Sequence, residues 1–212
     1  MSIDENGGIA MKLYFSPGAC SMAPHIVLNE AGYSFDLEKV NLSEKKTDSG
    51  EEFTKTNPKG YVPALRLDDG QVLTEVGVIL QYLADQKPDS RLAPAAGTME
   101  RYRLMEWLNF IAAELHKTLG ALFNPNILPG WKEDRLALFN KRLDFLTQAL
   151  DGKTYLLGDQ FTVADAYLFT VLNWTHFLHV DLEKWPRIQD YLGRVATRSA
   201  VQETMKEEGL TK

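Results

Sequence analysis

The chain has 212 residues, of which 44% are hydrophobic and 25% charged, and its formal net charge is −6. That length allows one domain or two, and the apolar fraction excludes disorder of the whole chain. No apolar run is long enough to cross a bilayer, no secretory signal is visible, and Lys45-Lys46 is the only basic cluster, so we expect neither a membrane protein nor a partner of nucleic acids.

The first half of the chain alternates strand and helix patterns. Residues 1–10 are polar and acidic and are expected to form a mobile tail, either from an upstream start codon or an added remnant, since Met11 directly precedes the first strand pattern. Strands are predicted at 12–15, 35–40, 64–67 and 72–73, and helices before Gly32, at 51–56 and at 74–84. A βαβ unit followed by a hairpin and a helix predicts a compact α/β domain over 11–90, with a parallel strand pair.

The second half shows only helical periods. Two prolines and Gly97 indicate a linker, placed at 91–97, and an all-α domain is expected over 98–212. The predicted helices cover 99–123, 131–150, 162–177 and 186–197. Thr162 and Asp165 have the spacing of a capping box, with Phe161 as a hydrophobic staple, and are interpreted as folding signals.

Cys20 is the single cysteine of the chain, which excludes an internal disulfide, a Cys-rich metal site and a CxxC dithiol. It lies between the loop 16–19 and a predicted helix, where unpaired N–H groups and the helix dipole favour a thiolate and lower the cysteine pKa. Ser21 is placed to donate a hydrogen bond to such a sulfur. The position also suits a small, buried, unreactive residue. With no secretory signal, one cysteine points to the cytoplasm.

Several polar residues have ordinary structural interpretations when the residues are taken alone. Glu75 is an acid favoured at a helix N-terminus, Lys45 a solvated charge, and Pro63 a trans turn proline. His116 is a half-buried histidine, although Asn109, Ala113 and His116 follow at steps of four and three and would share one stripe that suits the wall of a cleft. The large aromatic side chains of the second half are expected to be mostly core, namely Phe110, Phe123, Trp131, Trp174 and Phe177.

The motifs in combination resemble the cytosolic glutathione transferases. In the first half these are Pro-Gly-Ala-Cys-Ser at 17–21, Asn-Pro-Lys-Gly-Tyr-Val-Pro at 57–63 and Leu-Thr-Glu at 73–75, and in the second half the runs at 101–102, 106–109, 114–117 and 161–169. The resemblance runs from Met11 to about Leu210 and is closest to the bacterial beta class, which carries cysteine at this place. It implies a thioredoxin-like domain, an all-α domain with the electrophile pocket, and a homodimer.

The resemblance also implies roles for individual residues. Cys20 would face the sulfur of glutathione and form a mixed disulfide with it, and Ser21 and His116 would be the other catalytic residues. The expected glutathione-binding residues are Cys20, Lys45, Val62, Pro63, Glu75, Val76, Asn109, Ala113, Glu114, Leu115, His116 and Lys117. No metal is expected.

The three parts of glutathione would meet different residues. Val62, before a cis bond to Pro63, would pair with the cysteinyl part, and Lys45 would meet the glycyl carboxylate. Glu75 would meet the γ-glutamyl ammonium and the Val76 N–H its carboxylate. Val76 replaces the Gly or Ser common at this place, so only a backbone contact is retained. Residues 109–117 would approach from the helical domain across the dimer.

The expected function is that of a glutathione S-transferase, a detoxification enzyme in which the glutathione thiolate attacks small hydrophobic electrophiles. Thiol–disulfide exchange through Cys20 is expected beside it. Glutathione would be a co-substrate, with no further cofactor. Two alternatives stay open: a non-catalytic ligand-binding or stress-response relative, and a specialised dehalogenase, isomerase or ether-cleaving enzyme. The sequence does not identify the electrophile.

Overall fold

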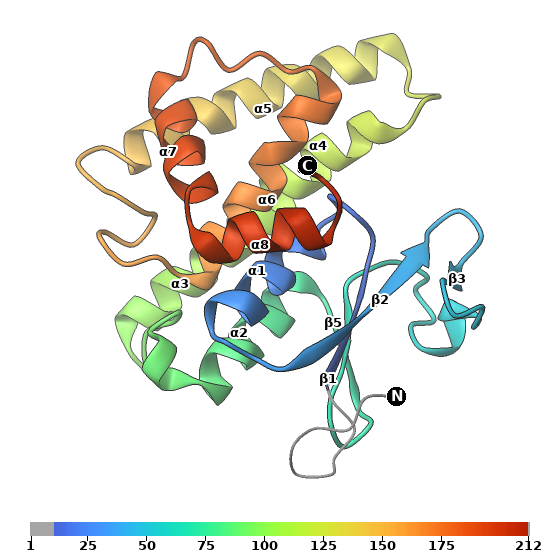
Figure 1. Ribbon diagram of the computed structural model, residues 1–212. Coiled ribbons are helices and arrows are strands. Elements are labelled where there is room, and N and C mark those ends of the chain that lie inside the picture. The colour runs from blue at the N-terminus through green and yellow to red at the C-terminus, as the bar shows by residue number, and fades with distance from the viewer. Residues whose placement is uncertain (1–10, 212) are drawn as a thin grey trace. The chain divides into compact units, whose positions relative to one another are not determined.

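The chain forms two compact units. Figure 1 shows the computed structural model, which describes residues 11–211, so the tail expected at 1–10 lies outside the described residues. The first unit comprises the described residues up to Ser90 together with those from Ser199 onward, and the second comprises Arg91–Arg198. The sequence pattern predicts a helical domain over all of 98–212, whereas in the structure the described residues from Ser199 onward belong to the first unit.

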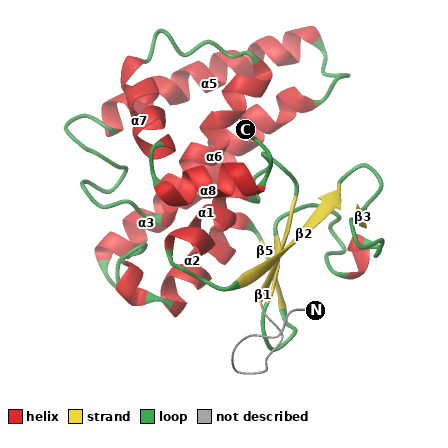
Figure 2. Cartoon of the chain, viewed as in Figure 1, coloured by secondary structure: helices red, strands yellow, loops and turns green. Residues whose placement is uncertain are grey.

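A five-stranded mixed sheet forms the centre of the first unit (Figure 2). Its strands are β1 (Met11–Phe15), β2 (Phe35–Asn41), β3 (Lys46–Thr47), β4 (Ala64–Arg66) and β5 (Val72–Thr74), in the order β3-β2-β1-β4-β5. The β1–β2 pair is parallel, as predicted, and the other neighbours are antiparallel. The two-residue strand β3 is not among the predicted strands. This βαβ unit with its following hairpin confirms the thioredoxin-like arrangement.

Helices α1 (Met22–Glu30), α2 (Val76–Gln86) and α8 (Ser199–Glu207) belong to the same unit as the sheet. The helix predicted at 51–56 is a single 3₁₀ turn, Phe53–Lys55. No helix is predicted at 199–207, yet α8 packs against α1, and the two ribbons lie side by side in Figure 1. Val201 and Thr204 are completely buried, so α8 contributes to the core of the first unit.

The second unit contains helices and no strand among its described residues. They are α3 (Met99–Phe110), α4 (Lys117–Gly120), α5 (Pro129–Ala149), α6 (Val163–Leu178) and α7 (Pro186–Ala196). Between α3 and α4, the segment Ile111–His116 is a π-helix, so the helix predicted over 99–123 is not regular. The apolar residues Ile111, Leu115 and Leu119 are all completely buried, so this segment and the start of α4 contribute to the helical core.

The predicted capping box begins α6. The Asp165 carboxylate accepts hydrogen bonds from the Thr162 N–H at 2.9 Å and from the Thr162 hydroxyl at 3.0 Å. Asp165 is completely buried, and it also accepts from the Leu156 N–H and the Tyr191 hydroxyl. Burial raises the pKa of Asp165 above its usual value, although these hydrogen bonds act to lower it. The two residues are therefore structural, as the sequence analysis proposes.

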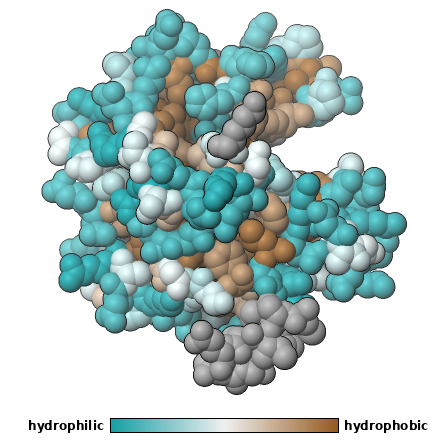
Figure 3. Space-filling view, in the orientation of Figure 1, coloured by the Kyte–Doolittle hydropathy of each residue, from teal (hydrophilic) through white to brown (hydrophobic). Residues whose placement is uncertain are grey.

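Hydrophilic side chains cover most of the face shown in Figure 3. In the described part of the chain, no helix is long and apolar enough to cross a membrane. Several large apolar side chains are nevertheless exposed, and Phe123, Trp131 and Phe177 are each about half exposed. The expectation that these three aromatics are core residues is therefore wrong, whereas Trp174 is buried as expected.

Candidate active site

The loop between β1 and α1 carries Cys20, and its conformation is held by its own polar groups. The Ser21 hydroxyl, which is completely buried, accepts a hydrogen bond from the Ser16 N–H at 3.2 Å and donates to the Ser16 carbonyl at 3.3 Å. A hydroxyl has one proton, and here Ser16 receives it. Ser21 thus shapes the loop, in place of the expected bond to the cysteine sulfur.

The Cys20 thiol is half-buried and lies against the entrance to β4. Its Sγ donates to the Val62 carbonyl across 3.3 Å. The Val62–Pro63 bond is cis, as the family resemblance implies. The loop with the thiol and the backbone expected to pair with a cysteinyl ligand are therefore neighbours in space, although 42 positions separate them in the sequence.

The start of α1 differs from the expectation of unpaired N–H groups beside Cys20. The N–H groups of Met22, Ala23 and His25 donate to the carbonyls of Ala19, Cys20 and Ser21. Pro24 has no N–H to offer. The dipole of the helix would still stabilise a thiolate at Cys20. These three N–H groups would not, because they already donate to carbonyls of the chain.

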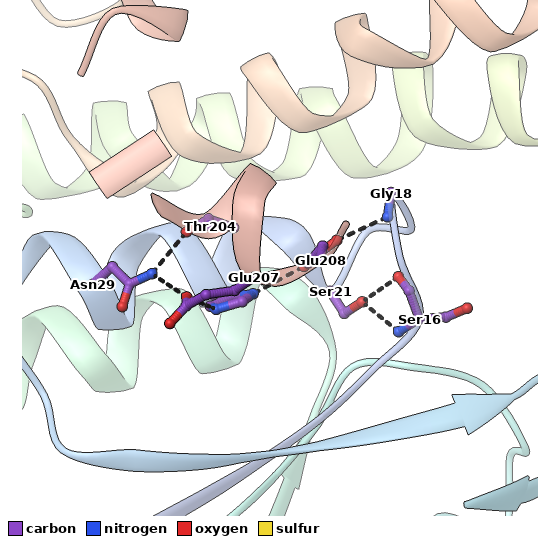
Figure 4. Close-up of polar contacts among 8 residues, drawn as sticks. Ser16, Gly18, Ser21, Asn29, Thr204, Glu207 and Glu208 are labelled. Carbon is purple, nitrogen blue, oxygen red and sulfur yellow. Dashed lines mark hydrogen bonds and ion pairs between the residues drawn. The ribbon is translucent and has the colours of Figure 1, made fainter. Parts of the chain in front are cut away.

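Two glutamates at the end of α8, drawn in Figure 4, contact the cysteine loop and the helix that follows it: Glu207 is the last residue of α8, and Glu208 comes directly after it. The Glu208 carboxylate accepts from the Gly18 N–H at 2.8 Å and lies 3.0 Å from Nδ1 of His25. Glu207 lies 2.8 Å from Nε2 of the same ring, and both the His25 and Glu208 side chains are completely buried. A buried carboxylate is stable only when it is paired and hydrogen-bonded, so this contact fixes Gly18 two residues before the thiol.

Glu75 stands at the N-cap of α2 with a positive φ of 71° and is already in contact with an ammonium group. Lys59 Nζ donates to Glu75 Oε1, and the Tyr61 hydroxyl donates to the same oxygen at 3.3 Å. The hydrogen bond to Glu75 raises the pKa of Lys59. The carboxylate expected to bind the γ-glutamyl ammonium therefore has a cation of the chain itself as its partner.

Lys45 also has a positive φ, 57°, and lies beside the same turn. Its Nζ donates to the Gly60 carbonyl at 2.7 Å. A Cβ added at Gly60 would lie 3.5 Å from the Lys45 side chain, and Gly60 itself has a φ of 70°, which favours glycine. Lys45, Glu75 and Val62 thus all contact the segment 57–63 or belong to it.

In the second unit, His116 lies in a cluster of aromatic rings. Its Nδ1 is 2.7 Å from the Tyr167 hydroxyl, and its ring meets Trp174 edge-on at a centroid distance of 4.8 Å. The ring of Phe123 contacts Trp174 in the same way at 5.6 Å. A histidine whose Nδ1 is occupied has its tautomer set by that partner, so Tyr167 orients His116.

The other expected residues of this unit have different surroundings. Asn109 is exposed and donates to the Met105 carbonyl at 3.0 Å, and Glu114 accepts two hydrogen bonds from Arg142. Ala113 and Lys117 are exposed. The side chain of Leu115 is completely buried and packs in the helical core, so it is not exposed to a ligand. Their binding of glutathione stays a prediction.

The helical unit also contains an open cavity of about 370 Å³. It lies at the end of α6, against α5 and the segment before α7. Apolar residues and lysines line it, among them Leu122, Leu136, Leu178, Trp185, Lys132 and Lys184.

Four residues of the site escape the sequence analysis: Lys59, His25, Tyr167 and Glu208. Lys59 belongs to the motif at 57–63, so its place in that motif could have suggested a role. Val201, Thr204 and Glu208 follow at steps of three and four, which is a helical period. Nothing in the sequence pairs Glu208 with Gly18, since 190 positions separate them.

Comparison with known proteins places the chain in a family. The family model described as glutathione S-transferase, N-terminal domain, matches residues 18–86, and the corresponding C-terminal domain matches residues 129–194. The chain is 44% identical over 200 residues to glutathione S-transferase GstA of Escherichia coli O157:H7, covering 94% of this chain and all of the relative.

Two solved structures are similar over most of the chain. A glutathione transferase from Methylococcus capsulatus is 59% identical with a TM-score of 0.94, and the match covers 95% of this chain and all of that one. A bacterial beta-class enzyme from Sphingomonas chungbukensis is 45% identical with a TM-score of 0.91, covering 94% and 100%. The chain therefore belongs to the glutathione S-transferase family, within its bacterial beta class, and is an enzyme of that family.

Proposed function

We propose that the chain binds glutathione along the segment 57–63 and exchanges disulfides with it through Cys20, besides transferring it to small hydrophobic electrophiles. The observation that carries the proposal is the 3.3 Å contact between the Cys20 thiol and the Val62 carbonyl. A peptide paired with the backbone at Val62, as in strand addition, would present its own thiol to that of Cys20. Proximity of this kind converts an encounter of the Cys20 thiolate with the disulfide of oxidised glutathione into an oriented reaction.

The disulfide exchange is a substitution at sulfur. The Cys20 thiolate attacks one sulfur of oxidised glutathione, a new S–S bond forms between Cys20 and that half, and the other half leaves as a thiolate. A second glutathione thiolate reverses the step by attacking the mixed disulfide. No group other than glutathione is needed for this balance, so we propose that no further cofactor takes part.

The charged ends of glutathione find complementary groups in the first unit. Lys45 offers its ammonium for the glycyl carboxylate, and Glu75 offers its carboxylate for the γ-glutamyl ammonium. The N–H groups of Val76 and Gly77 at the start of α2 suit the γ-glutamyl carboxylate, since the intrahelical bonds begin with Val78 and Ile79, which donate to the Glu75 carbonyl. Contacts from Asn109, Glu114, His116 and neighbours in a homodimer complete this proposal.

The half-exposed ring of Phe123, near Trp174 and His116, favours an apolar electrophile. In conjugation the thiolate of glutathione is the nucleophile, and a neutral His116 would accept its proton. Glutathione is abundant in the cytoplasm, where a reduced thiol at Cys20 persists, so we propose that location.

Intact mass after incubation with oxidised glutathione tests the exchange step. The expected result is a gain of one glutathionyl group that a reductant removes and that Cys20→Ala abolishes. Conjugation should survive in Cys20→Ala, because glutathione supplies its own sulfur. Absence of the adduct in the unmodified chain would contradict the exchange chemistry. Tight ligand binding without turnover of any electrophile would favour a non-catalytic binder instead.

A further inference from the structure

One ion pair of the first unit, between Lys59 and Glu75, has charges that complement those of the γ-glutamyl end of glutathione. Of the two residues, only Glu75 is assigned to glutathione above. Lys59 Nζ contacts Glu75 Oε1 and also donates to the Thr74 hydroxyl at 3.0 Å. Tyr61 adds its hydroxyl to the same carboxylate oxygen, and its ring lies 5.7 Å from the Lys59 ammonium. A cation and an anion therefore lie next to each other at the start of α2.

The pair is accessible to a ligand. The side chain of Lys59 is 42% exposed and that of Glu75 is 55% exposed. An ion pair this exposed contributes little to folding stability, since solvent screens it. The pair lies beside the segment 57–63, which is proposed to bind glutathione, so its members can exchange partners with a ligand at little cost in folding stability.

The turn that carries Lys59 is held firmly by a buried side chain. Asn57 is 1% exposed, its Oδ1 accepts the Lys59 N–H at 3.2 Å, and its Nδ2 donates to the Tyr61 carbonyl at 2.6 Å. The Gly60 N–H donates to the Asn57 carbonyl at 2.8 Å. Asn57 thus fixes the backbone on both sides of Lys59. Because the Lys59 side chain extends from a fixed backbone position, its ammonium can reach only nearby groups.

The γ-glutamyl end of glutathione carries an ammonium and a carboxylate on one carbon. A ligand with only an ammonium would displace Lys59 from Glu75 and leave the lysine without its anion. A ligand with both groups gives each member of the pair a new partner, so no charge is left alone. Recognition of this kind rejects a ligand that lacks one group, because a charge of the protein then loses its partner.

We propose that Lys59 is a specificity-determining residue that binds the α-carboxylate of the γ-glutamyl end while Glu75 binds the α-ammonium. The pair then exchanges its internal contact for two contacts with a zwitterion. The inference rests on the proposed function, because it places the glutamyl end of glutathione at Glu75. It adds that the α-carboxylate of the γ-glutamyl end is bound by a side chain, that of Lys59, as well as by the N–H groups at the start of α2.

Binding of glutathione and two analogues, measured by calorimetry in the presence of a reductant, tests the proposal. One analogue, glutaryl-cysteinylglycine, lacks the α-ammonium, and the other, 4-aminobutyryl-cysteinylglycine, lacks the α-carboxylate. Lys59→Met should weaken glutathione and the glutaryl analogue about threefold to tenfold. It should tighten binding of the aminobutyryl analogue, because no lysine charge then loses its partner, and Lys59→Arg should restore the affinity for glutathione.

Lys55→Met is the matched control, since it removes the same charge from the neighbouring 3₁₀ turn and has no contact with Glu75 among the described hydrogen bonds. It should leave all three affinities unchanged. Equal weakening of both analogues by Lys59→Met, or tighter binding of glutathione, would overturn the inference about Lys59. Glu75→Gln separates the two levels: if it leaves glutathione binding unchanged, the proposed placement of the glutamyl end is itself wrong.

Discussion

Glu208 offers a sharp test of how the cysteine loop is held, because the glutamate that directly precedes it, Glu207, contacts the same histidine and serves as a control. Its carboxylate accepts from the Gly18 N–H with one oxygen and faces His25 Nδ1 with the other. In Glu208→Gln the side chain keeps its size and shape. A carboxylate accepts at both oxygens, but an amide accepts at only one and presents an NH₂ group at the other. Either Gly18 or His25 therefore loses its acceptor.

The structure sets the scale of the loss. The Glu208 side chain is completely buried, so water cannot replace the lost partner. Leaving a buried group without its charged partner costs about 3 kcal/mol. For a chain of this size that corresponds to a Tm lower by about 6–12 °C. Glu207, in contrast, is 34% exposed, so Glu207→Gln should cost about 1 kcal/mol or less and lower the Tm by about 2–4 °C.

The assay combines stability with the chemistry of the loop. Thermal and urea unfolding of the two variants give the free energies, and both variants change the net charge equally. The rate of mixed-disulfide formation at Cys20, measured well below the Tm, reports on the loop that Gly18 begins. Glu208→Gln should slow that rate several-fold, and Glu207→Gln should not. Equal losses in both variants, or an unchanged Cys20 rate in Glu208→Gln, would refute the reasoning.

Two further predictions concern the helical unit. Tyr167→Phe removes the 2.7 Å hydrogen bond to His116 Nδ1. Losing a bond of about 1 kcal/mol in the transition state should lower kcat for conjugation about fivefold, with little change in the KM for glutathione. Steady-state kinetics measure this, and an equal change in KM would indicate a binding role instead. Thr162→Ala removes the capping box and should cost about 1 kcal/mol in urea unfolding, with unchanged kinetics in the folded enzyme. A loss near zero would show that Asp165 caps α6 alone.

The sequence predicts the elements whose signal is local. Tyr14 and Phe15 favour an extended β1, alternating apolar residues mark β2, and Asp69-Gly70 marks the β4–β5 hairpin. Long helical periods mark α5, α6 and α7. The elements that it misses depend on contacts with distant residues. The strand β3 has only two residues, paired with the end of β2, and the π-helix at Ile111–His116 has no sequence signal distinct from an α-helix. Helix α8 is short and ends near the C-terminus, where the pattern alone does not indicate burial.

The candidate site divides in the same way. Cys20, Val62 and Glu75 are found because family motifs carry them, and the structure puts the thiol of Cys20 against Val62. The hydrogen bond expected from Ser21 to the cysteine sulfur is replaced by one within the loop, because its hydroxyl donates to Ser16, and a catalytic role of Ser21 stays a prediction. Lys59 is passed over because an exposed lysine is ordinary until its distance to a particular carboxylate is known.

The surroundings of Cys20 come from three parts of the chain, and this limits what its loop can do alone. Ser21 closes the loop from within, the Val62 carbonyl contacts the thiol, and Glu208, which directly follows α8, holds Gly18. A boundary drawn at residue 90 would separate the loop from Glu208, leaving the buried His25 without either carboxylate. Residues 11–90 therefore contain the proposed nucleophile, Cys20, but not all of the contacts that hold its loop. The reactivity of Cys20 is a property of the complete first unit, including the helix that follows the helical domain in the sequence.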